Sequence, residues 1–302
     1  MQNQEIIEEI RELKKRKNAV ILAHCYQRIE IDLVADFVGD SLYLSRMAAG
    51  TDADLILFAG VYFMAETAKI LSPDKKVLLP RLESGCYMAD MINKEELLRF
   101  KNQNLGAPVV CYVNSSAEIK AESDICCTSA NAVEVVKSLD ASRVLFIPDR
   151  GLGSYVDSQI SDKEVISYMG YCPTHMRILP EDILEKTSQH PDAEVLVHPE
   201  CHMEVIKLAD YVGSTSGIMK RVRESFAKTF IIATEKGVVE RLERDFKNKR
   251  FILVSNKAIC ENMKWNTLTD ILYSLRNESP EISVDKDTAE KAALSINKML
   301  AL

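Results

Sequence analysis

The sequence contains one pattern three times over, at intervals of 88 and 86 residues. The apolar run Ile21–Tyr26 aligns with residues 109–114 and again with residues 195–200. With the same offsets and no gap, the segment 36–41 also finds two counterparts downstream. A repeat of this length is one supersecondary unit that packs against its neighbours. The pattern therefore predicts three similar structural modules.

Each repeat alternates strand-like and helical patterns. Short apolar runs end in small or polar residues and lead into helical segments, for example at 41–49. Strands alternating with helices at this spacing give parallel sheets that are covered on both faces. We expect an α/β fold of three pseudo-symmetric αβα modules with short parallel sheets. With boundaries at clusters of turn residues, the modules comprise residues 1–104 with an N-terminal helix at 4–17, residues 105–190, and residues 191–302 with a C-terminal helix at 286–300.

Charge and hydropathy narrow the classes of partner. The chain has 45 acidic and 38 basic residues and a net charge of −7, which argues against a nucleic-acid-binding surface. No apolar run is long enough to span a membrane, and the charged N-terminus lacks the apolar core of a signal peptide. We expect a cytoplasmic protein that acts on small metabolites, with neither nucleic acid nor membrane as a partner.

The repeat places chemically useful side chains at equivalent strand ends. Ligands of parallel α/β modules bind at the carboxyl ends of the strands. The first strands end in His24, Tyr112 and His198, followed two positions later by Tyr26, Asn114 and Glu200. The second strands end in Ser41, Ser129 and Thr215, each near an expected helix N-terminus that suits a carboxylate or phosphate. Each hydroxyl could instead be a simple helix cap and each histidine a structural residue, but their matched positions favour a ligand pocket.

Three of the eight cysteines also follow the repeat. Cys86, Cys172 and Cys260 lie in turn-like settings with spacings of 86 and 88 residues. The other five lie in or beside apolar runs, where a free cysteine packs as a small hydrophobe: Cys25, Cys111, Cys126, Cys127 and Cys201. Without a secretion signal, a disulfide framework is not expected.

A rough threefold axis would bring the three loop thiols together. They could hold zinc with an open fourth position, or three irons of a 4Fe-4S cluster with the fourth iron open; three unrelated thiols are the remaining interpretation. The threefold axis of a cubane favours the cluster. Its open iron would be a Lewis acid for substrate.

The sequence resembles the quinolinate synthases of de novo NAD biosynthesis over nearly its whole length. Characteristic stretches include Gly-Tyr-Cys-Pro-Thr-His at 170–175 and Cys-Glu-Asn-Met-Lys at 260–264. The other matching segments are 22–27, 39–42, 63–66, 85–86, 88–91, 112–114, 148–150, 198–201 and 213–217. The resemblance implies three α/β modules around a 4Fe-4S cluster, and an enzyme that condenses iminoaspartate with dihydroxyacetone phosphate to give quinolinate, phosphate and water. An aspartate-oxidising enzyme is the expected supplier of iminoaspartate.

The resemblance also implies roles for individual residues. The cluster ligands would be Cys86, Cys172 and Cys260. The proton-transfer group would be Tyr26, Tyr112, His198 and Glu200, with Glu200 and His198 as base and acid. The substrate-binding residues would be His24, Ser41, Asn114, Ser129, His175, Ser214 and Thr215, with His175 supporting either the cluster or a substrate group.

Two other classes of function fit part of the pattern. A non-catalytic iron-sulfur protein would usually have four protein ligands and little need for a polar pocket. A sugar-phosphate lyase could hold zinc in the same three-cysteine site. Trp265, close to Cys260, either narrows the pocket or packs beneath the loop.

Overall fold

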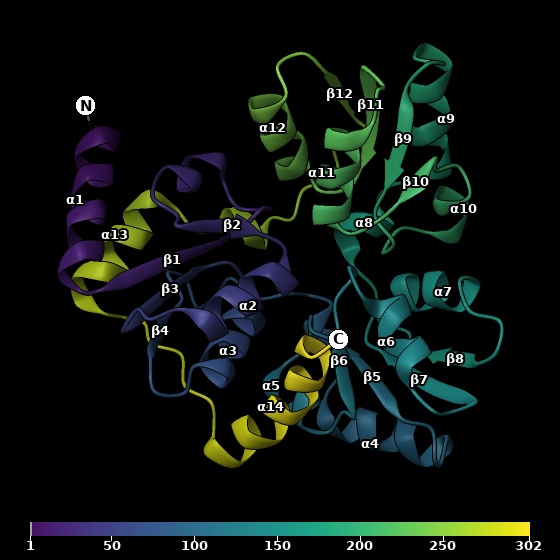
Figure 1. Ribbon diagram of the computed structural model, residues 1–302, viewed down its shortest axis with the longest axis horizontal. Coiled ribbons are helices and arrows are strands. Elements are labelled where there is room, and N and C mark those ends of the chain that lie inside the picture. Colours follow the sequence, from purple (N-terminus) through teal and green to yellow (C-terminus); the bar gives the residue numbers. More distant parts are fainter. Residues whose placement is uncertain (1) are drawn as a thin grey trace.

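The computed structural model describes residues 2–302, which form three four-stranded sheets. Every strand pairing within these sheets is parallel. Each sheet places its first and third strands in the middle and its second and fourth at the edges. Figure 1 shows the three sheets as separate lobes around a common centre. The predicted α/β fold of three αβα modules is confirmed.

The first module carries the N-terminal helix and has the strand order β2-β1-β3-β4. The N-terminal helix expected at 4–17 spans Gln2–Arg16. The elements of this part of the chain are α1 (Gln2–Arg16), β1 (Ala19–His24), η1 (Ile29–Leu33), β2 (Phe37–Gly39), α2 (Ser41–Gly50), β3 (Leu55–Ala59), α3 (Tyr62–Leu71), β4 (Lys76–Leu78) and η2 (Ala89–Met91).

The second and third modules repeat this order, as β6-β5-β7-β8 and β10-β9-β11-β12. The elements of the second are α4 (Lys94–Gln103), β5 (Val109–Tyr112), α5 (Ala117–Ala121), β6 (Ile125–Cys127), α6 (Ala132–Ser138), β7 (Arg143–Ile147), α7 (Arg150–Ser158), β8 (Glu164–Ser167) and α8 (Pro173–Met176). Those of the third are α9 (Pro180–Gln189), β9 (Glu194–Val197), α10 (Met203–Ile206), β10 (Tyr211–Val212), α11 (Thr215–Glu224), β11 (Thr229–Ala233), α12 (Lys236–Asp245), β12 (Arg250–Leu253) and η3 (Asn262–Lys264).

The central strands are continuous apolar runs because helices cover both faces of each sheet. All five residues of β3, Leu-Ile-Leu-Phe-Ala, are buried. An aspartate before each second strand accepts a backbone N–H from one of the first three residues of the first strand. The three bonds join Asp36 Oδ2 to Ile21 N (2.8 Å), Asp124 Oδ2 to Val109 N (2.7 Å) and Asp210 Oδ2 to Val195 N (2.8 Å). These repeated aspartates therefore have a structural role, because they join the first two strands of each sheet.

The last two helices return to the first two modules. Helix α13 (Leu268–Asn277) packs against α1 and β3, and Arg276 forms a 2.6 Å ion pair with Glu9. Helix α14 (Lys286–Leu300) packs against α5, β6 and α3, where its apolar face is buried. By chain order we assigned residues 286–300 to the third module, and this assignment stays a prediction. The module boundaries near residues 104 and 190 stay predictions.

None of the helices within residues 2–302 combines the length and the apolar character that a membrane crossing requires.

Candidate active site

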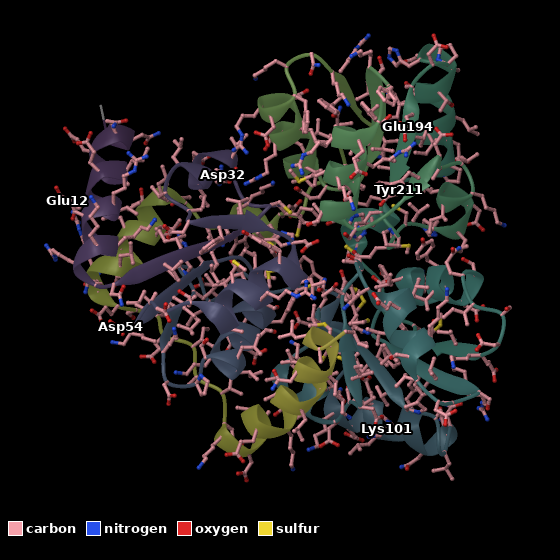
Figure 2. All side chains as sticks on the ribbon, viewed as in Figure 1. Glu12, Asp32, Asp54, Lys101, Glu194 and Tyr211 are labelled. Atoms are coloured by element: carbon pink, nitrogen blue, oxygen red, sulfur yellow. The ribbon has the colours of Figure 1, made fainter. Side chains whose placement is uncertain are left out.

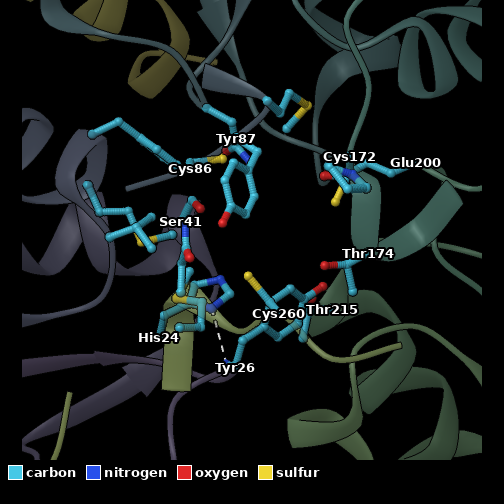
Figure 3. A pocket seen from close by; sticks show the side chains of 18 of the residues that line it. His24, Tyr26, Ser41, Cys86, Tyr87, Cys172, Thr174, Glu200, Thr215 and Cys260 are labelled. Atoms are coloured by element: carbon cyan, nitrogen blue, oxygen red, sulfur yellow. Dashed lines mark hydrogen bonds between the residues drawn. The ribbon is translucent and has the colours of Figure 1, made fainter. Parts of the chain in front are cut away.

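A cavity opens where the three modules meet, and residues from all of them line it (Figure 3). Its empty volume is about 920 Å³, including part of its opening to solvent. Twelve of the residues singled out from sequence line it: His24, Tyr26, Ser41, Cys86, Tyr112, Asn114, Ser129, Cys172, His198, Glu200, Thr215 and Cys260. The structure thus brings the matched strand ends and the three loop cysteines together.

The same backbone hydrogen bond holds each cysteine loop. In every module, the first residue of the helix after the third strand donates its N–H to the carbonyl two positions before the cysteine. The three bonds run from Tyr62 to Ser84 (2.7 Å), from Arg150 to Gly170 (2.8 Å) and from Lys236 to Ala258 (2.9 Å). In addition, Asn262 Nδ2 donates to Gly85 O at 2.9 Å and so joins two of the loops directly. The repeat therefore determines where the cysteines sit.

The three loop cysteines have the chemistry of a metal-binding set. All are free and half-buried, whereas the other five cysteines are free and buried. Withdrawal from solvent raises the pKa of Cys86 to about 12 and the pKa of Cys172 well above its ordinary value. Iron and zinc bind the thiolate, so loading the site must release protons. Three thiols from three modules on one cavity wall fit a cluster that has three protein ligands and one open iron.

Glu200 is a buried carboxylate surrounded by donors. Tyr112 OH donates to its Oε1 at 2.5 Å, and His175 Nδ1 lies 2.8 Å from its Oε2. Burial by itself would raise the pKa of Glu200, but the neighbouring imidazole of His175 and the hydrogen bonds from His175 and Tyr112 lower it well below its ordinary range. Glu200 is therefore ionised and able to accept a proton.

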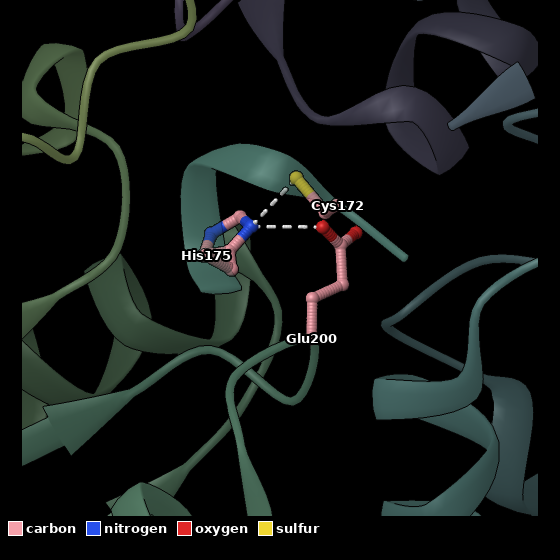
Figure 4. Close-up of side chains that lie close together, drawn as sticks. All are labelled: Cys172, His175 and Glu200. Atoms are coloured by element: carbon pink, nitrogen blue, oxygen red, sulfur yellow. Dashed lines mark hydrogen bonds and ion pairs between the residues drawn. The ribbon is translucent and has the colours of Figure 1, made fainter. Parts of the chain in front are cut away.

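His175 does not line the cavity but lies behind it. Its Nδ1 lies 3.2 Å from Cys172 Sγ as well as close to Glu200 (Figure 4). Its ring stacks on that of His198 at 4.4 Å. Because Cys172, His175 and Glu200 offer sulfur, nitrogen and oxygen within 4.8 Å of one another, this group could also hold a single metal ion.

The two strand-end histidines present the same face to the cavity. His24 Nδ1 accepts the backbone N–H of Tyr26 at 3.1 Å, and His198 Nδ1 accepts that of Glu200 at 3.4 Å. Burial lowers the pKa of each histidine to about 3, so both rings are neutral. With Nδ1 as acceptor, the proton is on Nε2. Each ring therefore offers one N–H donor to an anionic ligand.

At the ends of the second strands of the first and third modules, one residue caps the following helix and the next residue lines the cavity. Asp40 caps α2, with its side chain accepting the N–H of Tyr43 at 3.1 Å, and so leaves Ser41 at the cavity wall. Ser214 caps α11 in the same way and leaves Thr215 at the wall. Ser214 lies outside this cavity, and its assignment as a substrate anchor stays a prediction. Asn114, in contrast, lines the cavity with an Oδ1 that has no hydrogen-bond partner within residues 2–302, as expected of an atom reserved for a ligand.

Several residues at the site were not found from the sequence. Thr234 is fully buried and is hydrogen-bonded to both His175 and Tyr26. It directly follows the third strand of its module, at the position where the second module has Pro148, so the repeat could have drawn attention to it. Arg177 lines the cavity from an exposed position, and no pattern marked it. Trp265 is 47% exposed and is not part of the cavity wall.

Comparisons with known proteins cover the whole chain. Residues 8–301 match the family described as Quinolinate synthetase A protein. The chain is 51% identical over 302 residues to the quinolinate synthase of Alkaliphilus metalliredigens, covering 100% of both chains. The quinolinate synthase of Pelobacter propionicus is 52% identical over 300 residues, 99% of both chains. That of Methanosarcina barkeri is 50% identical over 302 residues, 100% of this chain and 99% of the relative. All three repeats lie within these matches.

Proposed function

The chain belongs to the quinolinate synthetase A family, and from this membership we propose that it condenses iminoaspartate with dihydroxyacetone phosphate to give quinolinate, phosphate and water. As a member of the family, it is an enzyme of quinolinate synthesis in NAD biosynthesis. The observation that carries the proposal is the common cavity, where three loop cysteines face strand-end acids, bases and hydroxyl groups. An aspartate-oxidising enzyme is proposed to supply iminoaspartate.

Cys86, Cys172 and Cys260 are proposed to hold a 4Fe-4S cluster, because they are the free cysteines that line the cavity and come one from each module. When bound, such a cluster supplies an open iron that acts as a Lewis acid toward substrate carboxylate, nitrogen or hydroxyl groups. The half-buried position of the thiols would keep the cluster at the cavity wall while leaving room for substrate beside it.

The remaining lining residues suit two small anionic substrates. The Nε2–H groups of His24 and His198, the hydroxyl groups of Ser41, Ser129 and Thr215, and the amide of Asn114 are proposed to bind the carboxylates and the phosphate. The N-terminus of α2 lies at the same wall and adds the positive end of a helix dipole.

Glu200 is proposed to be the base that takes a proton from a substrate carbon and returns it nearby. Its ionised state and its place at the cavity wall fit that role. Tyr112, which donates to it at 2.5 Å, is placed to stabilise the carboxylate before the transfer and to adjust its hydrogen bond afterwards. Tyr26 and His198 complete the proton-transfer group. His198 Nε2–H is the proposed acid that assists the loss of water.

The direct test is quinolinate formation by the purified protein under anaerobic conditions with both substrates. The proposal predicts quinolinate and phosphate in equal amounts, and no product when either substrate is omitted. If the protein binds iron but forms no quinolinate from these two substrates, the substrate assignment is wrong.

A further inference from the structure

Thr234 stands in the middle of a chain of hydrogen bonds that joins two walls of the cavity. Its Oγ1 lies 3.1 Å from Tyr26 OH and 2.9 Å from His175 Nε2. The side chain is fully buried and does not line the cavity itself. Any effect of Thr234 on the reaction must therefore pass through Tyr26 and His175.

The partners of His175 determine which of its ring nitrogens carries the proton. Nδ1 lies 2.8 Å from Glu200 Oε2, and an ionised carboxylate can only accept hydrogen bonds. Nδ1 is therefore a donor, and in the tautomer that carries its one ring proton on Nδ1, Nε2 is an acceptor. Thr234 is the residue that meets this need, because its hydroxyl can donate to Nε2.

The direction of the other bonds follows from this one. Since Thr234 gives its proton to His175, its oxygen is free to accept from Tyr26 OH. The oxygen of Tyr26 can in turn accept from Thr215, whose Oγ1 lies 3.1 Å away. One continuous set of donors thus runs from Thr215 to Glu200, and Tyr112 donates to Glu200 from the other side.

We propose that Thr234 is a positioning residue for the reaction. Its hydroxyl keeps His175 oriented with Nδ1–H toward Glu200 and Cys172, and keeps the phenol of Tyr26 at the cavity wall. The parts played by Glu200 and Tyr26 in this inference rest on the proposed function. The hydrogen-bond direction at His175 does not, since it follows from the contacts of the ring together with the ionised state of Glu200.

Thr234→Val tests the inference because valine has nearly the shape of threonine and lacks the hydroxyl. We expect kcat to fall about tenfold to a hundredfold, the usual loss when a residue that orients a metal-site ligand or its neighbour is removed. KM and iron content should stay close to those of the unsubstituted protein, since Thr234 touches neither cavity nor cysteine. Thr234→Ser keeps the hydroxyl and should restore kcat.

A second measurement is independent of activity. The chain has five histidines, so selective ¹⁵N labelling of the imidazoles gives a simple NMR spectrum of the full chain without its cluster. We expect His175 to carry its proton on Nδ1 and its Nε2 resonance to shift in Thr234→Val but not in Thr234→Ser. Thr234→Ala serves if the valine variant does not fold.

The following results would overturn the proposed role of Thr234. A His175 protonated on Nε2 alone, an Nε2 resonance unmoved by Thr234→Val, or full kcat in that variant would overturn the inference. Loss of kcat in both Thr234→Val and Thr234→Ser would also overturn it, because the hydroxyl would then not be the feature that matters. If the unsubstituted protein makes no quinolinate, the proposed function fails, while the NMR result still judges the role of Thr234.

Discussion

Single residues in the cavity differ in charge because their surroundings differ. Burial lowers the pKa of His24 and of His198 to about 3 and so keeps them neutral. Glu200 is equally buried, yet its contacts with His175 and Tyr112 keep its pKa low. The result is a pocket of neutral donors around an ionised carboxylate. This division suits the proposed proton transfer on an anionic substrate, because the proposed base is charged and the proposed anchoring groups are not.

Glu200→Gln should remove turnover while leaving the fold and the iron content in place. Glutamine has the size of glutamate and can still accept from Tyr112, but it cannot take up a proton. A drop in kcat of about a hundredfold to ten-thousandfold is expected for loss of a general base, measured as quinolinate formed under anaerobic conditions. Glu204→Gln, at an exposed position on α10, is the matched control. Full activity of Glu200→Gln would remove this residue from the mechanism.

The sequence predicts the strand-end residues and the cysteines of the cavity wall, but not the role of Thr234 behind it. The strand-end residues could be found because the repeat sets them in matching positions, as with His24, Tyr112 and His198. Thr234 could not be assigned a role, since its importance comes from contacts with residues 59 and 208 positions away. The same holds at the N-terminus of α11. The sequence alone does not tell which of Ser214 and Thr215 caps the helix and which lines the cavity.

Among the structural elements, the helix that follows each third strand has the largest effect on the site. Its first backbone N–H holds the cysteine loop of its own module. In the second and third modules, the N-terminus of this helix (α7 or α12) also meets the neighbouring module at very short range. A side chain at Gly151 would lie 2.6 Å from the backbone oxygen of Glu200, and one at Gly237 would lie 2.8 Å from that of Cys25. Glycine at these positions lets one element hold a cysteine loop and a strand-end loop together.

Gly237→Ala should therefore disturb both the module contact and the site. The added methyl group meets a backbone oxygen, which cannot move aside as a flexible side chain could. Strain of this kind costs about 1–3 kcal/mol of stability, measured by denaturant unfolding, and should lower kcat because the Tyr26 loop shifts. Gly50→Ala is the control, since a methyl group there has no neighbour within 4 Å. Equal stability of the two variants would show that the close approach at Gly237 does not contribute to the free energy of unfolding.

At the scale of the whole molecule, the modules form a closed ring of contacts. The second meets the third at Gly151, the third meets the first at Gly237, and the first meets the second where Glu66 accepts the N–H of Ala117 at 3.1 Å. The contact between the third and first modules is reinforced by Arg241, which is fully buried and forms a 2.5 Å ion pair with Asp32 (labelled in Figure 2). Closure of the ring is what places the three cysteine loops around one cavity.

The C-terminal part of the chain adds an acid-sensitive link. Glu278, just after α13, is paired with Lys17 and with Lys76, each at 2.5 Å. These two contacts lower the pKa of Glu278 to about 2. Because the folded-state pKa lies below the unfolded value of about 4.3, the pair stabilises the fold above that value, and the stabilisation is lost as the pH falls toward 2.

Glu278→Gln should thus lower the free energy of unfolding at pH 6. In acid, the variant and the unsubstituted protein should become equally stable. Urea unfolding at a series of pH values measures this, and the difference between the variant and the unsubstituted protein should shrink between about pH 4.3 and pH 2. The effect will be small because the pair is partly exposed to solvent. Glu243→Gln, an exposed residue with no ion pair within residues 2–302, is the control. A difference that stays constant with pH would contradict the assignment.

The threefold architecture could be predicted from the sequence because the same pattern of strands and helices occurs three times at nearly constant spacing. The place of α14 could not, since its burial against α5 and β6 depends on the surface that the second module leaves uncovered. The sequence therefore predicted the sheets and the strand-end site, while the packing of the last helices needed the three-dimensional arrangement.

Iron and sulfide content of protein purified without oxygen tests the central claim most directly. The account predicts about four irons and four sulfides per chain, lost on replacement of Cys86, Cys172 or Cys260 by alanine and retained in Cys126→Ala, whose thiol is buried in β6. Equal iron in all four variants, or a colourless protein that holds zinc instead, would contradict the account.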